Sequence, residues 1–231
     1  MHRLLSSRPQ PRTCGYDYAM VFDRSYFETQ YASYERQNPP RKMAFYRGLA
    51  EAAAVDCEKP RILDIGCAFG SFLSCLGPRW ERYGIDASEY AITRARERVP
   101  GAGFSVTAAS DLVFPGPFDV ISAFDVLEHM RAPDETLKRV AAALRPHGGF
   151  VFVVPVYDGL TGPAIRYLDR DPTHVHKRER DFWLEIAGVH FRIIDWWGIC
   201  RYLLPGGFYF HLVTRYFRRH TPAIACLARL P

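Results

Sequence analysis

Short apolar runs alternate with amphipathic stretches along the chain from residue 61 onward. Continuous apolar runs of a few residues predict strands buried on both faces, whereas apolar residues three and four apart predict helices. We expect strands at Arg61–Ile65, Arg82–Asp86, Phe104–Thr107, Asp119–Phe124, Phe150–Val154 and Phe191–Trp196. We expect helices at Met43–Val55, Gly70–Leu76, Ser88–Val99, Pro133–Leu144 and Asp181–Gly188. This alternation is typical of an α/β fold with a doubly wound, mostly parallel sheet.

The pattern near the C-terminus admits two interpretations. We favour a seventh strand at Ala223–Arg229, preceded by a helix at Phe208–Phe217. The alternative places the strand at Phe208–Val213 instead. Residues 156–180, which follow the fifth predicted strand, read as a long, polar, irregular loop. A loop of this length inside a compact domain is usually functional or mobile.

Composition agrees with one globular domain, because 48% of the 231 residues are hydrophobic and 24% are charged. The net charge of +5 comes entirely from residues 160–231, which hold 11 basic and 6 acidic residues. Five arginines and no acid follow from Arg201 onward. This region either forms a solvated basic face or contacts phosphate, an acidic acceptor or, peripherally, a membrane surface.

The six cysteines form no Cys-x-x-Cys pair, and no histidine cluster joins them at zinc-finger spacing. Reduced thiols and a cytoplasmic location fit this usage better than a disulfide framework does. The N-terminus, Met1–Gly15, has no apolar segment of the secretory type, and no run of 18 apolar residues predicts a membrane span.

The first predicted strand leads into a loop of small residues, which indicates a ligand close to the backbone. Gly66, Ala68 and Gly70 permit that approach, and the following helix offers unpaired N–H groups. The Gly-x-x-x-Gly spacing is not the NAD fingerprint, and no Gly-Lys-Ser/Thr follows as in a P-loop. Asp64, on the strand just before, would repel a pyrophosphate but attract a cation.

A second acid, Asp86, ends the second predicted strand 22 residues after Asp64. A carboxylate at such a strand end can accept hydrogen bonds from the hydroxyls of a ribose. The alternative is a structural cap for the helix that Ser88 begins. The fourth predicted strand, in turn, leads into the acidic and basic side chains of Asp125-Val-Leu-Glu-His129.

Three segments together carry a family resemblance: L-D-I-G-C-A-x-G from Leu63, G-I-D-A-S from Gly84, and F-D-V…D-V-L-E-H from Phe118. In order and spacing the chain resembles a class I S-adenosylmethionine-dependent methyltransferase of the broad small-molecule group. The resemblance implies S-adenosylmethionine as cofactor and a Rossmann-like sheet of seven strands, the last antiparallel. It also implies an N-terminal tail and helical lid at 1–58, and a cofactor-binding domain at 59–231 with an acceptor loop at 156–180.

The resemblance assigns roles to individual residues. Asp64 and Gly66 would hold the methionine end of the cofactor, and Asp86 the ribose. The implied cofactor set is Asp64, Gly66, Cys67, Ala68, Gly70, Asp86, Ala87, Ala109, Ser110, Ala123 and Phe124, with Tyr31 and Tyr34 from an N-terminal helix. By spacing alone, those tyrosines would be read as core packing. The family's usual acid after the third strand is replaced here by Ala108, so Asp111 or the backbone would serve the adenine.

Two histidines are candidates for removing a proton from the acceptor. His129 follows the fourth strand and His174 lies in the acceptor loop, where a nearby acid could support it. Packing within the fold is the structural alternative for His129. His174 and His176 with Asp171 form a weaker candidate metal site, because no further ligand is evident. The sequence therefore requires no metal.

The favoured function is methyl transfer from S-adenosylmethionine to an oxygen or nitrogen of a small-molecule or glycan-type acceptor. One alternative is a nucleic-acid methyltransferase that uses the basic C-terminal region. No RNA-binding signature accompanies that region, so we do not expect a nucleic-acid partner. The other alternative is a partner protein that binds the cofactor without catalysis. The sequence identifies neither the acceptor nor the oligomeric state.

Overall fold

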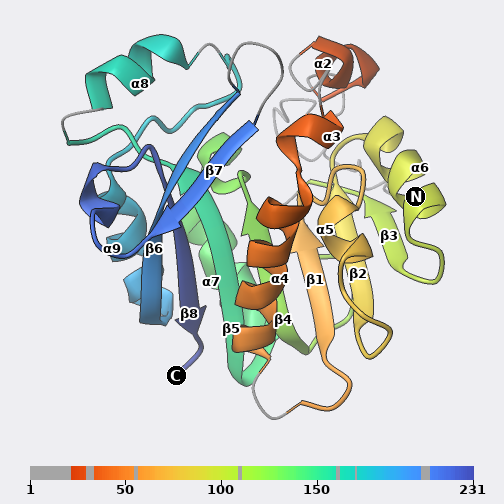
Figure 1. The fold of residues 1–231 in the computed structure, drawn as a ribbon. Coiled ribbons are helices and arrows are strands. Elements are labelled where there is room, and N and C mark those ends of the chain that lie inside the picture. The colour runs from red at the N-terminus through yellow and green to blue at the C-terminus, as the bar shows by residue number, and fades with distance from the viewer. Residues whose placement is uncertain are drawn as a thin grey trace, which may run out of the picture.

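An eight-stranded sheet with helices on both faces forms the described part of the protein (Figure 1). This computed structural model describes residues 22–29, 34–54, 57–108, 111–159, 162–169, 171–203 and 209–231. The strands are β1 (Arg61–Ile65), β2 (Glu81–Asp86), β3 (Gly103–Val106), β4 (Phe118–Phe124), β5 (Leu144–Pro155), β6 (Arg192–Leu203), β7 (Tyr209–Thr214) and β8 (Ala223–Arg229).

The spatial order of the strands is β3-β2-β1-β4-β5-β8-β6-β7. Strands β1 to β5 pair in parallel, whereas β8 runs antiparallel between β5 and β6. The order reverses between β1 and β4, where Asp64 lies opposite Ser122 and Ile65 opposite Ala123. Ligands of open α/β sheets bind at such a switch point, beyond the carboxyl ends of the strands.

The C-terminal strands correct one prediction. Tyr209–Thr214 is not helical but forms β7, which pairs antiparallel with an extended β6. The alternative prediction of a strand here is therefore right, and so is the favoured strand Ala223–Arg229. Within β7 the pattern is that of an edge strand, since His211 and Thr214 are buried while Leu212 is exposed. The described residues thus hold eight strands rather than seven, and the last in sequence is antiparallel, as predicted.

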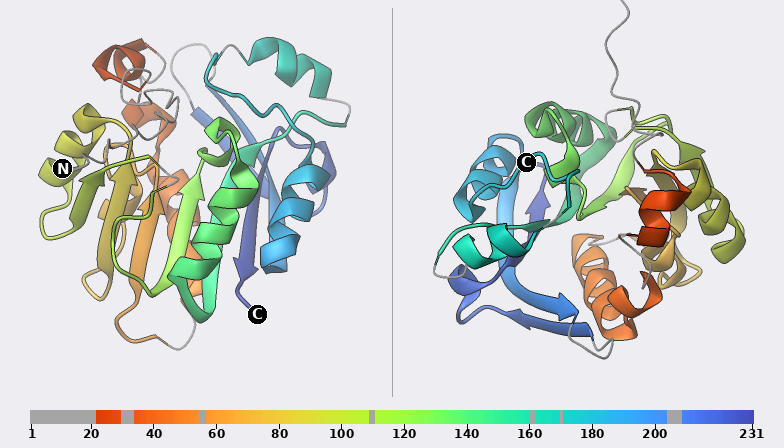
Figure 2. Two further views of the ribbon diagram at one scale, coloured as in Figure 1. Left: turned by 180° about the vertical axis from the view of Figure 1, so that it is seen from behind. Right: turned by 90° about the horizontal axis from the view of Figure 1, so that it is seen from above.

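Helices pack on both faces of the sheet (Figure 2). On one face lie α4 (Pro40–Ala53), α5 (Ser71–Ser74) and α6 (Glu89–Arg98), and on the other lie α7 (Pro133–Ala143) and α9 (Arg180–His190). Ser88 caps α6 as predicted, because its hydroxyl oxygen accepts the N–H of Ala91 at 3.2 Å. All five overlap the predicted helices, and α7 ends one residue early because Leu144 already adopts extended backbone.

The segments over the carboxyl ends of the strands complete the fold. Short helices α2 (Arg24–Thr29) and α3 (Tyr34–Gln37) lie above α5 and the first strands (Figure 1). The predicted irregular loop 156–180 contains a helix, α8 (Gly162–Leu168), and is irregular on either side of it. Within the described residues, no helix is long and apolar enough to cross a membrane.

Candidate functional site

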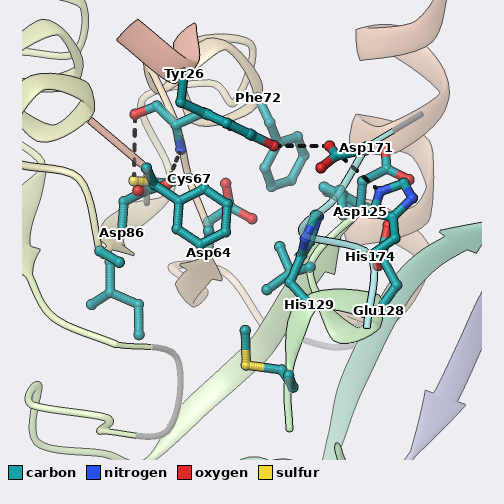
Figure 3. Close-up of a pocket in the computed structure, with 18 of the residues that line it drawn as sticks. Tyr26, Asp64, Cys67, Phe72, Asp86, Asp125, Glu128, His129, Asp171 and His174 are labelled. Atoms are coloured by element: carbon teal, nitrogen blue, oxygen red, sulfur yellow. Dashed lines mark hydrogen bonds and ion pairs between the residues drawn. The ribbon is translucent and has the colours of Figure 1, made fainter. Parts of the chain in front are cut away.

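A cavity of about 760 Å³ opens at the switch point of the sheet, beside α2 and α3. Its wall carries the acids that end β1 and β2 and, across the cavity, the histidines that follow β4 and α8 (Figure 3). The volume falls within the range of about 300–1,000 Å³ typical of small-molecule sites. The two groups of predicted site residues, far apart in sequence, therefore share one cavity.

The loop between β1 and α5 is shaped by positive φ angles at Gly66 (68°), Ala68 (45°) and Gly70 (72°). A Cβ atom added to Gly66 would come within 2.3 Å of Cγ2 of Val126, so no larger residue fits there. The carbonyl of Ile85 accepts the N–H groups of Gly66 and Cys67, at 2.8 and 3.0 Å. These hydrogen bonds connect the loop to β2 and fix its shape. Gly66, Cys67 and Ala68 of the loop line the cavity.

Asp86 connects this loop to the start of α6. Its two carboxylate oxygens accept the N–H of Ala68 and the N–H of Ser88, each at 2.9 Å. Burial raises the pKa of Asp86, although both backbone bonds favour the ionised form. Each oxygen keeps a lone pair after these bonds, so the carboxylate can still accept hydroxyl groups from a ligand. The structural and ligand-binding interpretations of Asp86 are thus compatible.

Asp64 is almost fully buried at the end of β1 and faces the cavity. The hydroxyl of Ser122 on β4 donates to its Oδ1 at 2.7 Å. Burial raises the pKa of the Asp64 carboxyl to about 7, and the Ser122 hydrogen bond only partly opposes this shift. A cationic ligand group would restore full ionisation, so the site is suited to bind a positive charge.

The remaining predicted cofactor residues have different locations. Ala87, Phe124 and Tyr34 line the cavity, and the Tyr34 ring lies 4.4 Å from that of Phe69. Burial raises the pKa of the Tyr34 hydroxyl to about 12. Two residues do not line the cavity in this structure: Gly70, which precedes α5, and Ala123, which is fully buried. Three predicted residues, Tyr31, Ala109 and Ser110, lie outside the described residues.

The adenine prediction falls on the segment after β3. Ala108 lines the cavity beside Thr107, whereas Asp111 is exposed and is not among the lining residues. The side chain of Asp111 therefore does not face the cavity in this structure. Of the two predicted alternatives for contacting the adenine, the backbone, here at Thr107 and Ala108, is the one that lines the cavity.

His129 and His174 meet at the other end of the cavity, with their ring centroids 4.7 Å apart (Figure 3). His129 lies on a short 3₁₀ helix, η1 (Leu127–His129), directly after β4. Nδ1 of His174 lies 2.8 Å from Oδ2 of Asp169. Burial and the neighbouring His174 lower the pKa of His129 to about 4, so this ring is neutral near pH 7.

His176 does not join this pair, contrary to the candidate metal site read from His174 and His176. Its ring packs beside Phe182 and Trp183, at centroid distances of 6.3 and 6.2 Å. The third group beside His129 and His174 is instead the carboxylate of Glu128. Burial raises the pKa of Glu128 well above its ordinary value. The sequence showed Glu128 only as part of a family motif and did not indicate a role for it.

A partly buried ion pair, which the sequence did not indicate, also lines the cavity. Both terminal nitrogens of Arg201, on β6, donate to the carboxylate of Asp125 at 2.5 Å. Burial would raise the pKa of Asp125, but the Arg201 guanidinium outweighs it and holds the pKa below its ordinary value. Lys42 lines the same wall, and burial lowers its pKa to about 8.

Comparison with known proteins gives one matching family. A family model described as a methyltransferase domain matches residues 33–191. The ubiquinone biosynthesis O-methyltransferase of Caulobacter vibrioides is 36% identical over 144 residues, which are 54% of this chain and 55% of that protein. The trans-aconitate 2-methyltransferase of Rhodopseudomonas palustris is 29% identical over 152 residues, or 64% and 52%. The chain thus spans about half the length of these curated relatives.

Solved structures share the fold at low sequence identity. A SAM-dependent methyltransferase of Thermotoga maritima superposes with a TM-score of 0.63 at 15% identity, covering 89% of this chain and 98% of that one. The N-methyltransferase NodS of Bradyrhizobium japonicum, solved with S-adenosyl-L-homocysteine, gives 0.60 at 18% identity, with 84% and 89% covered. At such identities the likeness concerns the fold alone.

Proposed function

Because the chain belongs to the methyltransferase domain family, in its class I group, we propose that it transfers a methyl group from S-adenosylmethionine to a small-molecule or glycan-type acceptor. The acceptor atom in this proposal is an oxygen or a nitrogen. The observation that carries the proposal is the single cavity that joins Asp64 and Asp86 to His129 and His174. Methyl transfer needs a cofactor site and an acceptor site that open into each other.

The residues at one end of the cavity fit the cofactor. The buried carboxylate of Asp64 is suited to the ammonium group of the methionine part, and Asp86 keeps lone pairs for the ribose hydroxyls. Val126 already fills the space that a Cβ at Gly66 would need, so the loop keeps this shape on the cavity wall only with glycine there. When bound, S-adenosylmethionine supplies a methyl group made electrophilic by its positively charged sulfur.

The residues at the other end have the task of positioning the acceptor and assisting the departure of its proton. Asp169 fixes the ring of His174 through Nδ1, and both histidine rings line the cavity. An imidazole oriented by a carboxylate is a common means of assisting proton removal. The methyl group is already reactive, so positioning and loss of this proton are the main contributions that remain for the protein.

The basic C-terminal arginines support a small acceptor rather than a nucleic acid. Arg201 is paired with Asp125, and both Arg215 and Arg218 pair with Asp195. The Arg229 guanidinium donates to the backbone carbonyls of residues 52 and 147. Arginines engaged within the protein have less capacity to neutralise a run of phosphates. Arginines paired within the protein also have less capacity to bind the anionic headgroups of a membrane, so the proposal does not depend on a membrane surface.

Calorimetric titration of the purified protein tests the cofactor half of the proposal. We expect micromolar binding of S-adenosylmethionine and S-adenosyl-L-homocysteine, and no binding of NADH. Asp86→Asn should weaken binding by about tenfold or more, which is about 1.4 kcal/mol. Asp111→Asn, which changes an exposed acid outside the cavity, should leave the affinity unchanged. Equal affinities of the wild type and Asp86→Asn would exclude the assigned role of Asp86.

An acceptor screen tests the other half. Phenols and sugars are incubated with S-adenosylmethionine, and release of S-adenosyl-L-homocysteine is followed. We expect turnover with at least one hydroxyl or amine acceptor. Tight cofactor binding with no turnover on any acceptor would instead favour the non-catalytic partner protein.

A further inference from the structure

The side chains of Glu128, His129 and His174 form a compact cluster, and their ligand-type atoms all lie within 4.8 Å of one another. Glu128 and His129 come from η1 after β4, whereas His174 comes from the loop after α8. All three line the cavity (Figure 3). The protein therefore brings one carboxylate and two imidazoles together across 46 residues of sequence.

The carboxylate of Glu128 is the independent sign that something binds here. Glu128 is fully buried, and neither of its oxygens has a hydrogen-bond partner among the described residues. A buried carboxylate without partners is costly, and proteins normally pair such a group or use it to coordinate a metal. Arg201, the nearby guanidinium, is already committed to Asp125 through both of its terminal nitrogens.

Both histidines are oriented as metal ligands usually are. Nδ1 of His129 lies 2.9 Å from the hydroxyl and 3.1 Å from the carbonyl oxygen of Thr173. Nδ1 of His174 lies 2.8 Å from the Asp169 carboxylate. A ligating histidine almost always donates its other ring N–H to a carboxylate or carbonyl, which fixes the tautomer and turns the free nitrogen to the ion. Here the remaining nitrogen is Nε2 in both rings, and Nε2 of His174 also lies 3.9 Å from Oδ2 of Asp171.

We propose that Glu128, His129 and His174 bind one divalent transition-metal ion. Two imidazoles and one carboxylate suit zinc, iron, manganese or cobalt. Ligand atoms bound at about 2.1 Å from one ion lie about 3–4 Å apart, so the side chains need to close by about an ångström. Three protein ligands leave coordination positions open, and these face the cavity that the three residues line.

The role of this ion in catalysis rests on the proposed methyl transfer, whereas its binding does not. With both histidines as ligands, the ion takes over the assistance to proton loss that the proposed function gives to the His174 ring. An acceptor hydroxyl at an open coordination position becomes more acidic, and its proton is released to water. The oxygen then forms the new bond to the methyl carbon as the carbon–sulfur bond breaks. The products are a methyl ether and neutral S-adenosyl-L-homocysteine. The substrate class is thereby narrowed to acceptors that present a hydroxyl group.

The test is a Zn²⁺ titration of the chelator-treated, full-length protein after removal of any histidine tag. We expect one Zn²⁺ per chain in the wild type. The isosteric Glu128→Gln, and His174→Ala, should lower the affinity at least about tenfold. Asp169→Asn, which alters only the partner of His174, should lower it by about 10- to 100-fold. The exposed His220→Gln is the matched control and should bind as the wild type does.

Two further readouts keep the result unambiguous. Co²⁺ bound to this set should give visible absorption bands without the thiolate charge-transfer band that cysteine ligands produce. His176→Gln should retain binding, because that ring lies apart from the cluster. Binding of S-adenosyl-L-homocysteine by each variant verifies that its fold is intact and tests the cofactor proposal separately. Zinc binding that is absent, unaltered in Glu128→Gln, or accompanied by the thiolate band would overturn the metal site.

Discussion

The Ser122 hydroxyl on β4 donates a hydrogen bond to the Asp64 carboxylate on β1, at 2.7 Å, across the strands where the sheet order reverses. The two residues are direct neighbours in the parallel pairing. This bond orients a buried acid toward the cavity but does not supply the positive charge that would fully stabilise its ionised form. The buried Asp64 carboxyl therefore has a raised pKa of about 7, and a cationic ligand would stabilise its ionised form.

The first prediction concerns the pH dependence of cofactor affinity. Only ionised Asp64 pairs with the ammonium group of S-adenosylmethionine, and its carboxyl has a pKa of about 7 in the free protein. Affinity should be constant above this pKa and fall as pH decreases below it, by up to about tenfold per unit. Titrations between pH 7.5 and pH 5.5 measure the slope. A flat profile in the wild type would contradict the role of Asp64, and Asp64→Asn should bind weakly at every pH.

The second prediction concerns stability of the free protein. The folded-state pKa of Asp64 is raised above the ordinary value of 3.8, so the carboxyl favours folding below pH 3.8. That contribution is lost as pH rises toward 7, where folding must bury a charge. Asp64→Asn should therefore match or exceed the thermal stability of the wild type at pH 8, although it binds cofactor poorly. A large loss of melting temperature at pH 8 would instead indicate a structural role.

The third prediction compares two glycines. Gly66→Ala places a Cβ 2.3 Å from Val126 at a φ of +68°, and should lower the free energy of unfolding by about 1–3 kcal/mol. Gly48→Ala, in the middle of α4 with nothing within 4 Å of the new Cβ, should raise it by about 0.5–1 kcal/mol. Chemical denaturation measures both changes. The prediction fails if the two variants shift stability in the same direction.

The fourth prediction concerns the partly buried pair of Asp125 and Arg201. Removal of one partner leaves the other charge partly buried without its partner, so Arg201→Met should cost about 1–3 kcal/mol in urea denaturation. Asp125 has a φ of +58°, a conformation that asparagine tolerates well. Adding Asp125→Asn to Arg201→Met should therefore recover part of the loss. No recovery in the double variant would mean that Arg201 acts through packing rather than charge.

The central strands were predictable because local pattern and burial agree in them. The apolar residues within β1, β4 and β5 each became part of a strand with helices over both faces. The helix predicted at β7 was wrong, because this segment's mixture of aromatic and polar residues suits a helix or an edge strand equally. The segment becomes a strand because β6 extends to Leu203 and pairs with it along its edge. This pairing is a tertiary contact, which the periodicity of the sequence cannot predict.

The part of the candidate site that lies at the carboxyl ends of the strands was predictable from the sequence. Asp64 and Asp86 end neighbouring parallel strands, so their positions on one cavity follow from the fold. The grouping of Glu128 with His174 depends instead on how the segment 171–176 folds back over η1. The adjacent sequence pair of His174 and His176 was the wrong guide, because the two rings point into different surroundings.

A crystal structure of the protein with S-adenosyl-L-homocysteine would show directly which residues hold the cofactor. We predict the ligand in the 760 Å³ cavity, with its ammonium group on the Asp64 carboxylate and its ribose hydroxyls on Asp86. Its sulfur should face the end that carries His129 and His174. A ligand bound elsewhere, or in this cavity without contacts to Asp64 and Asp86, would contradict the account.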